Sequence, residues 1–245
     1  MMVAILQYTP AILDGLLTTA IVALLSIIGA AIVSLLLGVL RSAKRMSVRA
    51  AAGGAVELLR GSSALVYLFW AYYALPALMP GIPRFNPFTA SITVLSLVGG
   101  AYGAEIVRGG LQAVPRGQFD ACRALGLPPY QALSRVILPQ ALSQIVPGFG
   151  SLAVDMVKWT SIVSFVGVQD VLYVANSVRS ITYETVAVFL VVAALYWVLC
   201  LFVSLAFHRI ERVLPLNRAL RASRQSTEAP LNGRPLSAQP LVLQQ

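Results

Sequence analysis

Long runs of apolar residues dominate the chain and alternate with short polar segments. About 20 consecutive apolar residues are needed for a helix to cross a bilayer, and windows of that kind recur five times. The predicted spans cover residues 11–40, 57–79, 87–108, 136–157 and 183–207. The pattern therefore predicts an all-α membrane protein with about five transmembrane helices.

Composition agrees with this prediction. Of the 245 residues, 58% are hydrophobic and 11% are charged, against about 25% charged residues in soluble domains. The first apolar run is much longer than the core of a signal peptide and has no basic stretch before it, so we interpret it as a retained span. The polar segment 213–245 is rich in proline, serine and arginine, and we expect it to be a disordered cytoplasmic tail.

Basic residues are distributed unequally over the predicted loops. With the N-terminus outside, 15 of the 18 basic residues fall on the inner side, and only Arg84, Lys158 and Arg179 do not. Basic residues of short loops remain in the cytoplasm. We therefore expect residues 1–10 to be extracytoplasmic and the C-terminus to be cytoplasmic. The net charge of +9 then reflects membrane topology, and we expect no nucleic-acid partner.

The fourth predicted span is unusually polar, with prolines, glycines, glutamines and Asp155. Such a helix is costly to expose to lipid, so we expect it inside the bundle or along a watery cavity. Two interpretations stay open, namely close packing through small residues and the lining of a pathway. The stretch that follows is interrupted by Gly167 and Asp170, and we expect a re-entrant or interfacial piece on the outer side.

The loop between the third and fourth spans, residues 115–135, is expected to be cytoplasmic and carries helix signals on both sides of a glycine. Pro115 favours a helix start, Gly126 favours a helix end, and Pro128-Pro129 suits the first turn of a second helix. Two short helices that meet at a glycine form a compact knob, which is suited to docking into a groove of a partner. On periodicity alone, an ordinary interfacial loop is the simpler interpretation.

The loop and the start of the fourth span carry Asp120-Ala121-Cys122, then Gly126, and later Leu138-Pro139. This pattern resembles the EAA loop of ABC-transporter permeases. That family has Glu-Ala-Ala, a Gly four positions later, and Leu-Pro near the start of the next span. The matching positions here are Asp120, Ala121, Gly126, Leu138 and Pro139. Asp stands in place of Glu, Cys122 in place of the second Ala, and Val136 in place of Ile.

The resemblance extends beyond the loop, over about residues 12–212. The segments VELLRGSSALVYLFWAYYALP and AYGAEIVRGGLQAVPRGQFDACRALGL are similar to those of permeases for polar amino acids. The segment VKWTSIVSFVGVQDV resembles that subfamily's Lys-Asp-Thr-Ser-Leu region, with Trp159 where an Asp is usual.

The resemblance implies a type I ABC importer permease fold over residues 11–212. In that family the loop is the ATPase-coupling element, through which ATP-driven closure of a separate subunit switches the spans between inward-open and outward-open states. The implied partners are ABC ATPase subunits that bind ATP and Mg, an extracytoplasmic solute-binding protein, a second copy or sister permease, and membrane lipid. The implied location is the bacterial inner membrane, which the chain crosses several times.

Motifs for enzyme chemistry are missing from the sequence. Its two lysines, Lys44 and Lys158, lie in no P-loop, so we expect ATP hydrolysis on a partner chain. No nucleophile motif is present. The single histidine, His208, has no companion ligands for a metal and is interpreted as an interfacial residue. We therefore expect no catalytic residue, metal or cofactor in this chain.

Charged pairs within or at the edges of spans are the remaining candidates. Glu57 with Arg60, and Glu105 with Arg108, are spaced i, i+3, so each pair can meet on one helix face. Both pairs lie near the inner membrane edge. We interpret them as structural ion pairs in preference to substrate contacts.

Asp155 and Lys158 share this spacing near the outer end of the fourth span. A zwitterionic amino acid needs an acceptor for its ammonium group and donors for its carboxylate. These two residues, with Thr160 and Ser161, are therefore candidates for a substrate pathway. Alternatively, Lys158 extends toward the interface and simply pairs with Asp155. Trp159 could make a cation–π or stacking contact with a different substrate.

Taken together, the sequence predicts the permease subunit of an ATP-driven importer for polar amino acids, and not an enzyme. Within transport, the alternative is a permease for another small zwitterion, such as a compatible solute or an opine. From other classes, the alternatives are a membrane-embedded enzyme and an assembly scaffold. The lack of a catalytic cluster argues against the enzyme, and the spacing of the loop argues against the scaffold.

Overall fold

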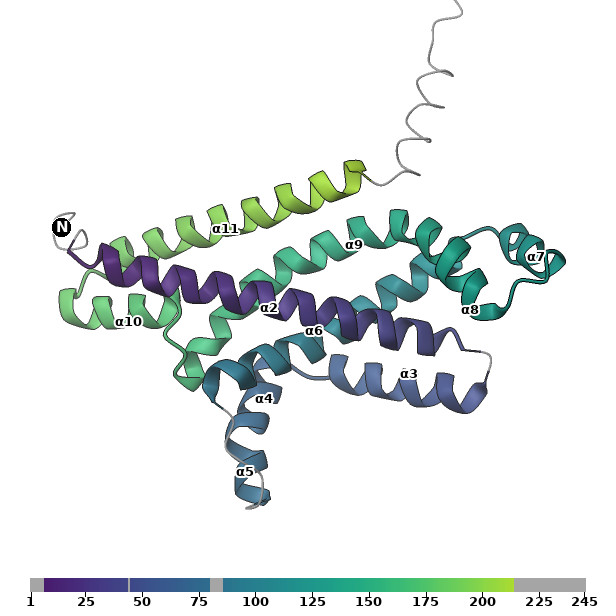
Figure 1. Ribbon diagram of the computed structural model, residues 1–245. Coiled ribbons are helices and arrows are strands. Elements are labelled where there is room, and N and C mark those ends of the chain that lie inside the picture. Colours follow the sequence, from purple (N-terminus) through teal and green to yellow (C-terminus); the bar gives the residue numbers. More distant parts are fainter. Residues whose placement is uncertain (1–6, 44, 80–85, 214–245) are drawn as a thin grey trace, which may run out of the picture.

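The computed structural model describes residues 7–43, 45–79 and 86–213, and in these ranges all regular structure is helical. Figure 1 shows the long helices lying side by side along one direction, with α7 and α8 at one end and α10 at the other. The predicted all-α class is confirmed. The tail after Val213, most of the N-terminal segment, and Arg84 lie outside the described residues.

Within the described residues, four helical stretches are long and apolar enough to cross a membrane. They coincide with four of the five predicted spans. These stretches are α2 (Thr9–Arg41), α6 (Pro87–Gln112), the continuous run Pro129–Val166, and α11 (Thr185–Val213). The continuous run consists of α8 (Pro129–Gln131), the π-helix η2 (Ala132–Ile137), α9 (Leu138–Trp159) and the 3₁₀-helix η3 (Thr160–Val166).

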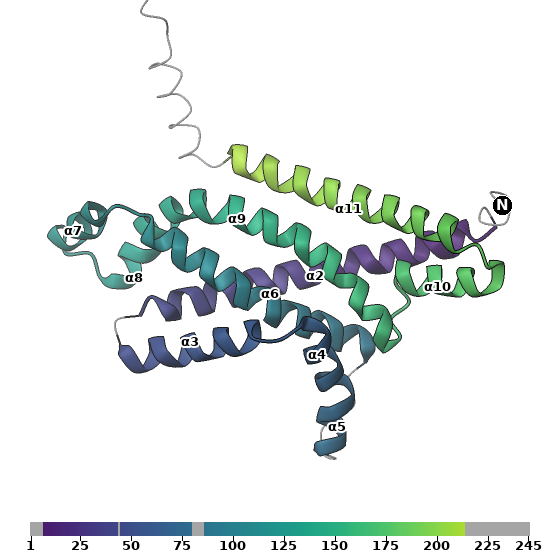
Figure 2. The same cartoon turned by 180° about the vertical axis from the view of Figure 1, so that it is seen from behind.

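The remaining predicted span, 57–79, is wrong as one continuous helix. The chain forms α3 (Met46–Arg60), breaks, and then continues as α4 (Ala64–Phe69), η1 (Trp70–Ala74) and α5 (Leu75–Leu78). The break arises because Ser63 caps the start of α4, its hydroxyl accepting the Leu65 N–H at 3.3 Å. The apolar part is therefore only Ala64–Leu78, and it projects away from the other helices (Figures 1 and 2).

The helix α6 is the centre of the bundle, since 67% of its apolar window is buried against 11% in α11. It packs along the length of α2 through small residues on both helices. Gly103 is one such contact, because a Cβ there would lie 2.6 Å from the Cβ of Ser34 on α2 and 3.0 Å from the ring of Phe149 on α9. This close approach lets α2, α6 and α9 share one core.

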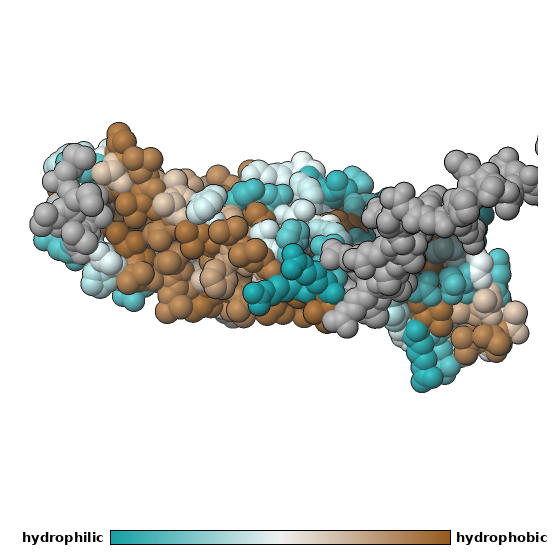
Figure 3. All heavy atoms as spheres, turned by 90° about the horizontal axis from the view of Figure 1, so that it is seen from above, coloured by the Kyte–Doolittle hydropathy of each residue, from teal (hydrophilic) through white to brown (hydrophobic). Residues whose placement is uncertain are grey.

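Polar helices and hydrophobic spans are segregated along the molecule. Hydrophobic residues cover much of the face seen in Figure 3, and hydrophilic residues gather toward the end that carries α7. Large apolar side chains of α11, such as Trp197 and Phe202, are exposed. Together with its low burial, this surface marks α11 as a helix that faces lipid or another protein.

Two short helices complete the described chain. The helix α7 (Arg116–Ala124) belongs to the predicted loop, and α10 (Val171–Thr182) follows η3. The helix α10 packs on α2 and α11 at the end of the bundle opposite to α7 (Figure 1). The expectation of an interfacial piece after the fourth span corresponds to η3 and α10 in position.

Candidate functional site

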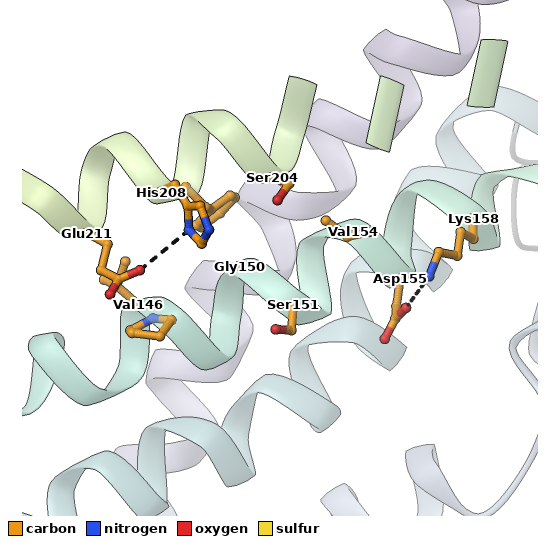
Figure 4. A pocket seen from close by; sticks show the side chains of 11 residues that line it. Val146, Gly150, Ser151, Val154, Asp155, Lys158, Ser204, His208 and Glu211 are labelled. Atoms are coloured by element: carbon orange, nitrogen blue, oxygen red, sulfur yellow. Dashed lines mark hydrogen bonds and ion pairs between the residues drawn. The ribbon is translucent and has the colours of Figure 1, made fainter. Parts of the chain in front are cut away.

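A cavity of about 480 Å³ lies between α9 and α11. Three of its polar side chains come from α9 and three from α11, and Figure 4 shows each set along its helix. They are Ser151, Asp155 and Lys158 on α9, and Ser204, His208 and Glu211 on α11. Each set is spaced i, i+4, i+7, so each forms a stripe along one helix face. The polar lining therefore runs along about two turns of each helix.

The charges in this cavity are of both signs. The Lys158 ammonium donates to the Asp155 carboxylate at 2.9 Å, and these side chains are 60% and 53% exposed. The His208 Nδ1 lies 3.6 Å from a Glu211 carboxylate oxygen. Exposed ion pairs contribute less than about 1 kcal/mol, so a charged ligand could replace one partner at little cost.

The other two predicted pathway residues do not reach this cavity. Thr160 is fully buried, and its hydroxyl donates to the Val157 carbonyl at 2.7 Å. The Ser161 hydroxyl donates to the Lys158 carbonyl at 2.9 Å, and Ser161 is not among the residues that line the cavity. Their hydroxyls are used to close the turn where α9 tightens into η3.

Trp159 faces away from the cavity and into the core. Its ring packs on Tyr102 of α6 with the centroids 5.5 Å apart, and the Arg60 guanidinium lies over the same tyrosine at 5.1 Å from its centroid. The aromatic residue at this position thus joins α9 to α6. The idea of a stacking contact between Trp159 and a substrate finds no support in this geometry.

The conformation of Gly126 determines how the chain turns in the predicted knob. After α7, Gly126 has a φ of +66°, which L side chains rarely adopt. The Gly126 N–H donates to the Arg123 carbonyl at 2.9 Å and the Leu127 N–H to the Cys122 carbonyl at 3.0 Å. This pair of bonds is the Schellman motif, and it turns the chain sharply toward α8.

The knob presents a mixed surface to its surroundings. Leu125 and Tyr130 are 77% and 69% exposed, and Asp120 makes an exposed ion pair with Arg123 at 3.2 Å. The base of the knob is fixed, because Cys122 is buried and Gln140 of α9 donates to Gln118 of α7 at 3.2 Å. Among the other predicted coupling positions, Ala121 is exposed, Leu138 is half-buried and begins α9, and Pro139 lies in the first turn of that helix.

Near the junction of α2, α3 and α6, three arginines converge on Glu105. Arg108 donates to it at 2.8 Å, Arg60 approaches within 3.8 Å, and Arg41 forms a further ion pair. The predicted pairing of Glu105 with Arg108 is present. No ion pair between Glu57 and Arg60 is seen among the described residues, where Glu57 is exposed and Arg60 approaches Glu105. Whether these groups act only structurally stays a prediction.

A buried polar cluster lies where α10 meets α2 and α11. Asp170 has no exposed surface and caps α10, accepting the Tyr173 N–H at 2.9 Å. The Tyr196 hydroxyl donates to its other oxygen at 3.4 Å, and the Thr19 hydroxyl accepts the Val171 N–H at 3.1 Å. Burial raises the pKa of the Asp170 carboxyl to about 6, although the capping bond acts in the opposite direction.

Residues 42–214 match the model of a protein family described as the binding-protein-dependent transport system inner membrane component. The chain belongs to this family. It is therefore a multi-pass membrane permease and not an enzyme. In the described part of this permease, no group of three or more His, Cys, Asp or Glu residues could hold a metal ion.

Curated relatives of the chain are also named as permeases. The permease is 42% identical over 159 residues to a probable amino-acid ABC transporter permease protein of Sinorhizobium fredii, covering 64% of this chain and 67% of that one. It is 31% identical over 209 residues to an L-cystine transport system permease protein of Bacillus subtilis, covering 85% and 88%.

Among solved structures, the permease resembles a chain from the crystal structure of an amino acid ABC transporter with histidines. The TM-score is 0.76 at 31% sequence identity, and the likeness covers 86% of this chain and 97% of that chain. The fold is that of type I ABC importer permeases, as the sequence predicted. The role as an importer permease is likewise confirmed.

Sequence reasoning missed the α11 side of the cavity. Ser204, His208 and Glu211 were overlooked because the last span is otherwise strongly apolar, and His208 was interpreted as an interfacial residue. Their i, i+4, i+7 spacing is the signal that could have identified them. The sequence has no local signal that these residues face α9, because the pairing of α9 with α11 is a tertiary contact.

Proposed function

We propose that this permease carries polar amino acids, and that the cavity between α9 and α11 is part of their path. The observation that carries the proposal is that charges of both signs line the cavity, with Asp155 and Lys158 toward one end and Glu211, beside His208, toward the other. An amino acid has one ammonium and one carboxylate group, and both need partners when they leave bulk water.

The charge balance supports a zwitterion over a singly charged solute. A carboxylate and an ammonium lie 2.9 Å apart in the Asp155–Lys158 pair, so a ligand that carries both signs can exchange with the pair without leaving a net charge uncompensated. The names of two relatives, which mention amino acids and L-cystine, support the same substrate class. The alternatives of a compatible solute or an opine share the zwitterionic chemistry.

We further propose how the permease is driven. The knob formed by α7 and α8 would lie in the cytoplasm and dock into a separate ATPase, which binds ATP and Mg. The exposed Leu125 and Tyr130 support a contact with a protein groove. A solute-binding protein on the outer side and a second permease chain, identical or a sister, would complete the transporter in the bacterial inner membrane. The distribution of basic residues supports this orientation.

The test is ATP-dependent uptake of a panel of labelled amino acids by the complex reconstituted into liposomes. We expect Asp155→Asn and Lys158→Gln each to raise the apparent KM about tenfold or more, since a charge-assisted hydrogen bond to the substrate is lost. Asp14→Asn and Arg179→Gln are the matched controls, because both side chains are exposed and neither lines the cavity. Both controls are expected to transport like the wild type.

An unchanged apparent KM in the two cavity variants would contradict the proposed path and leave Asp155 and Lys158 as a structural pair. Uptake of no amino acid by a complex that hydrolyses ATP would contradict the substrate class. Uptake of betaine-like solutes by the same complex would then favour the compatible-solute alternative.

A further inference from the structure

A second, larger cavity of about 880 Å³ lies at the end of the bundle that carries the knob. It is open on one side and lined by the C-terminal ends of α2 and α6, Arg49 of α3, the start of α7, and η2. Figure 1 shows these segments at the same end of the molecule. Because α2 and α6 are spans that end here, the cavity lies at the level where a membrane-crossing helix meets the interface.

The charges of this cavity have one sign. Arg41, Arg49 and Arg116 line it, and no aspartate or glutamate of the described residues does. Arg41 is partly neutralised because it pairs with Glu105 deeper in the bundle. Arg49 and Arg116 are exposed and make no ion pair with another described residue. The cavity thus has at least two uncompensated positive charges, which favours an anionic ligand.

The rest of the wall is largely apolar. Leu111, Val114 and Ile137 are buried at its back, and Phe119 is 37% exposed at its side. A small inorganic anion would gain nothing from such a surface. A ligand with an anionic head and an apolar body would pair with the arginines and also cover the apolar wall.

We propose that this cavity binds the headgroup of an anionic phospholipid, with the arginines on the phosphate and the first part of the acyl chains against the apolar wall. Basic pockets between transmembrane helices at the cytoplasmic side are suited to such headgroups. The site adjoins the knob, because Phe119 belongs to α7 and Pro129 opens α8. A bound lipid would therefore contact both the knob and the ends of α2 and α6, and would stabilise their relative position. This site does not depend on the proposed substrate.

The test is native mass spectrometry of the full-length chain in mild detergent, titrated with phosphatidylglycerol or with phosphatidylcholine. We expect one phosphatidylglycerol to be retained and phosphatidylcholine to be lost. The double variant Arg49→Gln/Arg116→Gln should bind phosphatidylglycerol about 30-fold more weakly, since each basic residue near an anionic lipid surface contributes about fivefold. Arg49→Lys/Arg116→Lys keeps the charge and should retain most of the binding.

The matched control is Arg209→Gln/Arg212→Gln, which removes two arginines of α11 that do not line the cavity. It should bind phosphatidylglycerol like the wild type. Glycerol 3-phosphate, which is a headgroup fragment without acyl chains, and inorganic phosphate should not displace the lipid at equal concentration.

Three results would overturn the proposal. The first is equal retention of phosphatidylglycerol by the wild type and the Arg49→Gln/Arg116→Gln variant. The second is displacement of the lipid by inorganic phosphate or glycerol 3-phosphate at equal concentration, which would identify a simple anion site. The third is unchanged lipid retention together with loss of the co-purifying ATPase, which would assign the arginines to a protein contact.

Discussion

Asp170 is the one acidic side chain without solvent exposure among the described residues. It connects three helices, because it caps α10, accepts a hydrogen bond from Tyr196 of α11, and lies against Gly15 of α2. The capping hydrogen bond and the burial of Asp170 have opposite effects on the ionisation of its carboxyl. The cap favours a carboxylate, whereas burial disfavours the charged form and raises the pKa to about 6.

This raised pKa predicts that the folded state loses stability as pH rises. Burial raises the pKa of this carboxyl to about 6 in the folded protein, whereas in the unfolded chain it ionises near its ordinary pKa of 3.8. The folded state therefore binds more protons between these values, and the free energy of unfolding falls by about 3 kcal/mol across that window. The midpoint of thermal unfolding in detergent should be several degrees lower at pH 7.5 than at pH 5.

The variant Asp170→Asn should remove most of this difference, because asparagine caps a helix as well as aspartate does but does not ionise. Asp14→Asn, at an exposed acid of α2, is the control and should keep the wild-type dependence. An equal fall in the midpoint with pH for the Asp170→Asn variant and the wild type would show that another group is responsible.

At the scale of elements, the contact between α2 and α6 is held by small residues that allow close approach. We predict that Gly103→Leu destabilises the fold by about 1–3 kcal/mol or more, since the new side chain would collide with Ser34 and Phe149. Gly109 lies on the same helix with nothing within 4 Å of a Cβ, so Gly109→Leu is the control. Thermal unfolding of both purified variants checks this, and equal midpoints would contradict the packing argument.

The second element-scale prediction concerns the turn between α7 and α8. A Cβ on Gly126 would meet nothing within 4 Å, so only its positive φ restricts substitution. Gly126→Val should lose most ATP-dependent uptake and most co-purifying ATPase, because a branched residue there costs about 1–2 kcal/mol and reshapes the knob. Gly126→Asn, which tolerates this conformation, should retain both. Full uptake by the valine variant would argue against the knob as the coupling element.

At the scale of the whole molecule, the sequence predicts features that depend on neighbouring residues, such as the positions and ends of helices. Apolar runs identified four of the spans, and Gly126 identified the end of α7. The break at Ser63 was missed because 57–79 is apolar enough to pass as one window, although Gly61 and two serines interrupt it. The convergence of three arginines on Glu105 could not be predicted, because Arg41, Arg60 and Arg108 come from three helices that only tertiary packing brings together.

The central claim is that substrate passes along the cavity between α9 and α11, and cysteine accessibility tests it directly. The chain has two cysteines, Cys122 and Cys200, so Cys122→Ala/Cys200→Ala gives a cysteine-free background. In that background, Ser151→Cys introduces one thiol in the cavity. The measurement is the rate of its reaction with a membrane-impermeant maleimide in the reconstituted complex, with and without an amino acid that the complex transports.

We expect the thiol at position 151 to react and a transported amino acid to slow the reaction at least several-fold. Ser180→Cys, at an exposed site of α10 outside the cavity, should react at a rate that no amino acid changes. A thiol at position 151 that stays unreactive throughout the transport cycle, or that reacts equally fast with and without substrate, would contradict the proposed path.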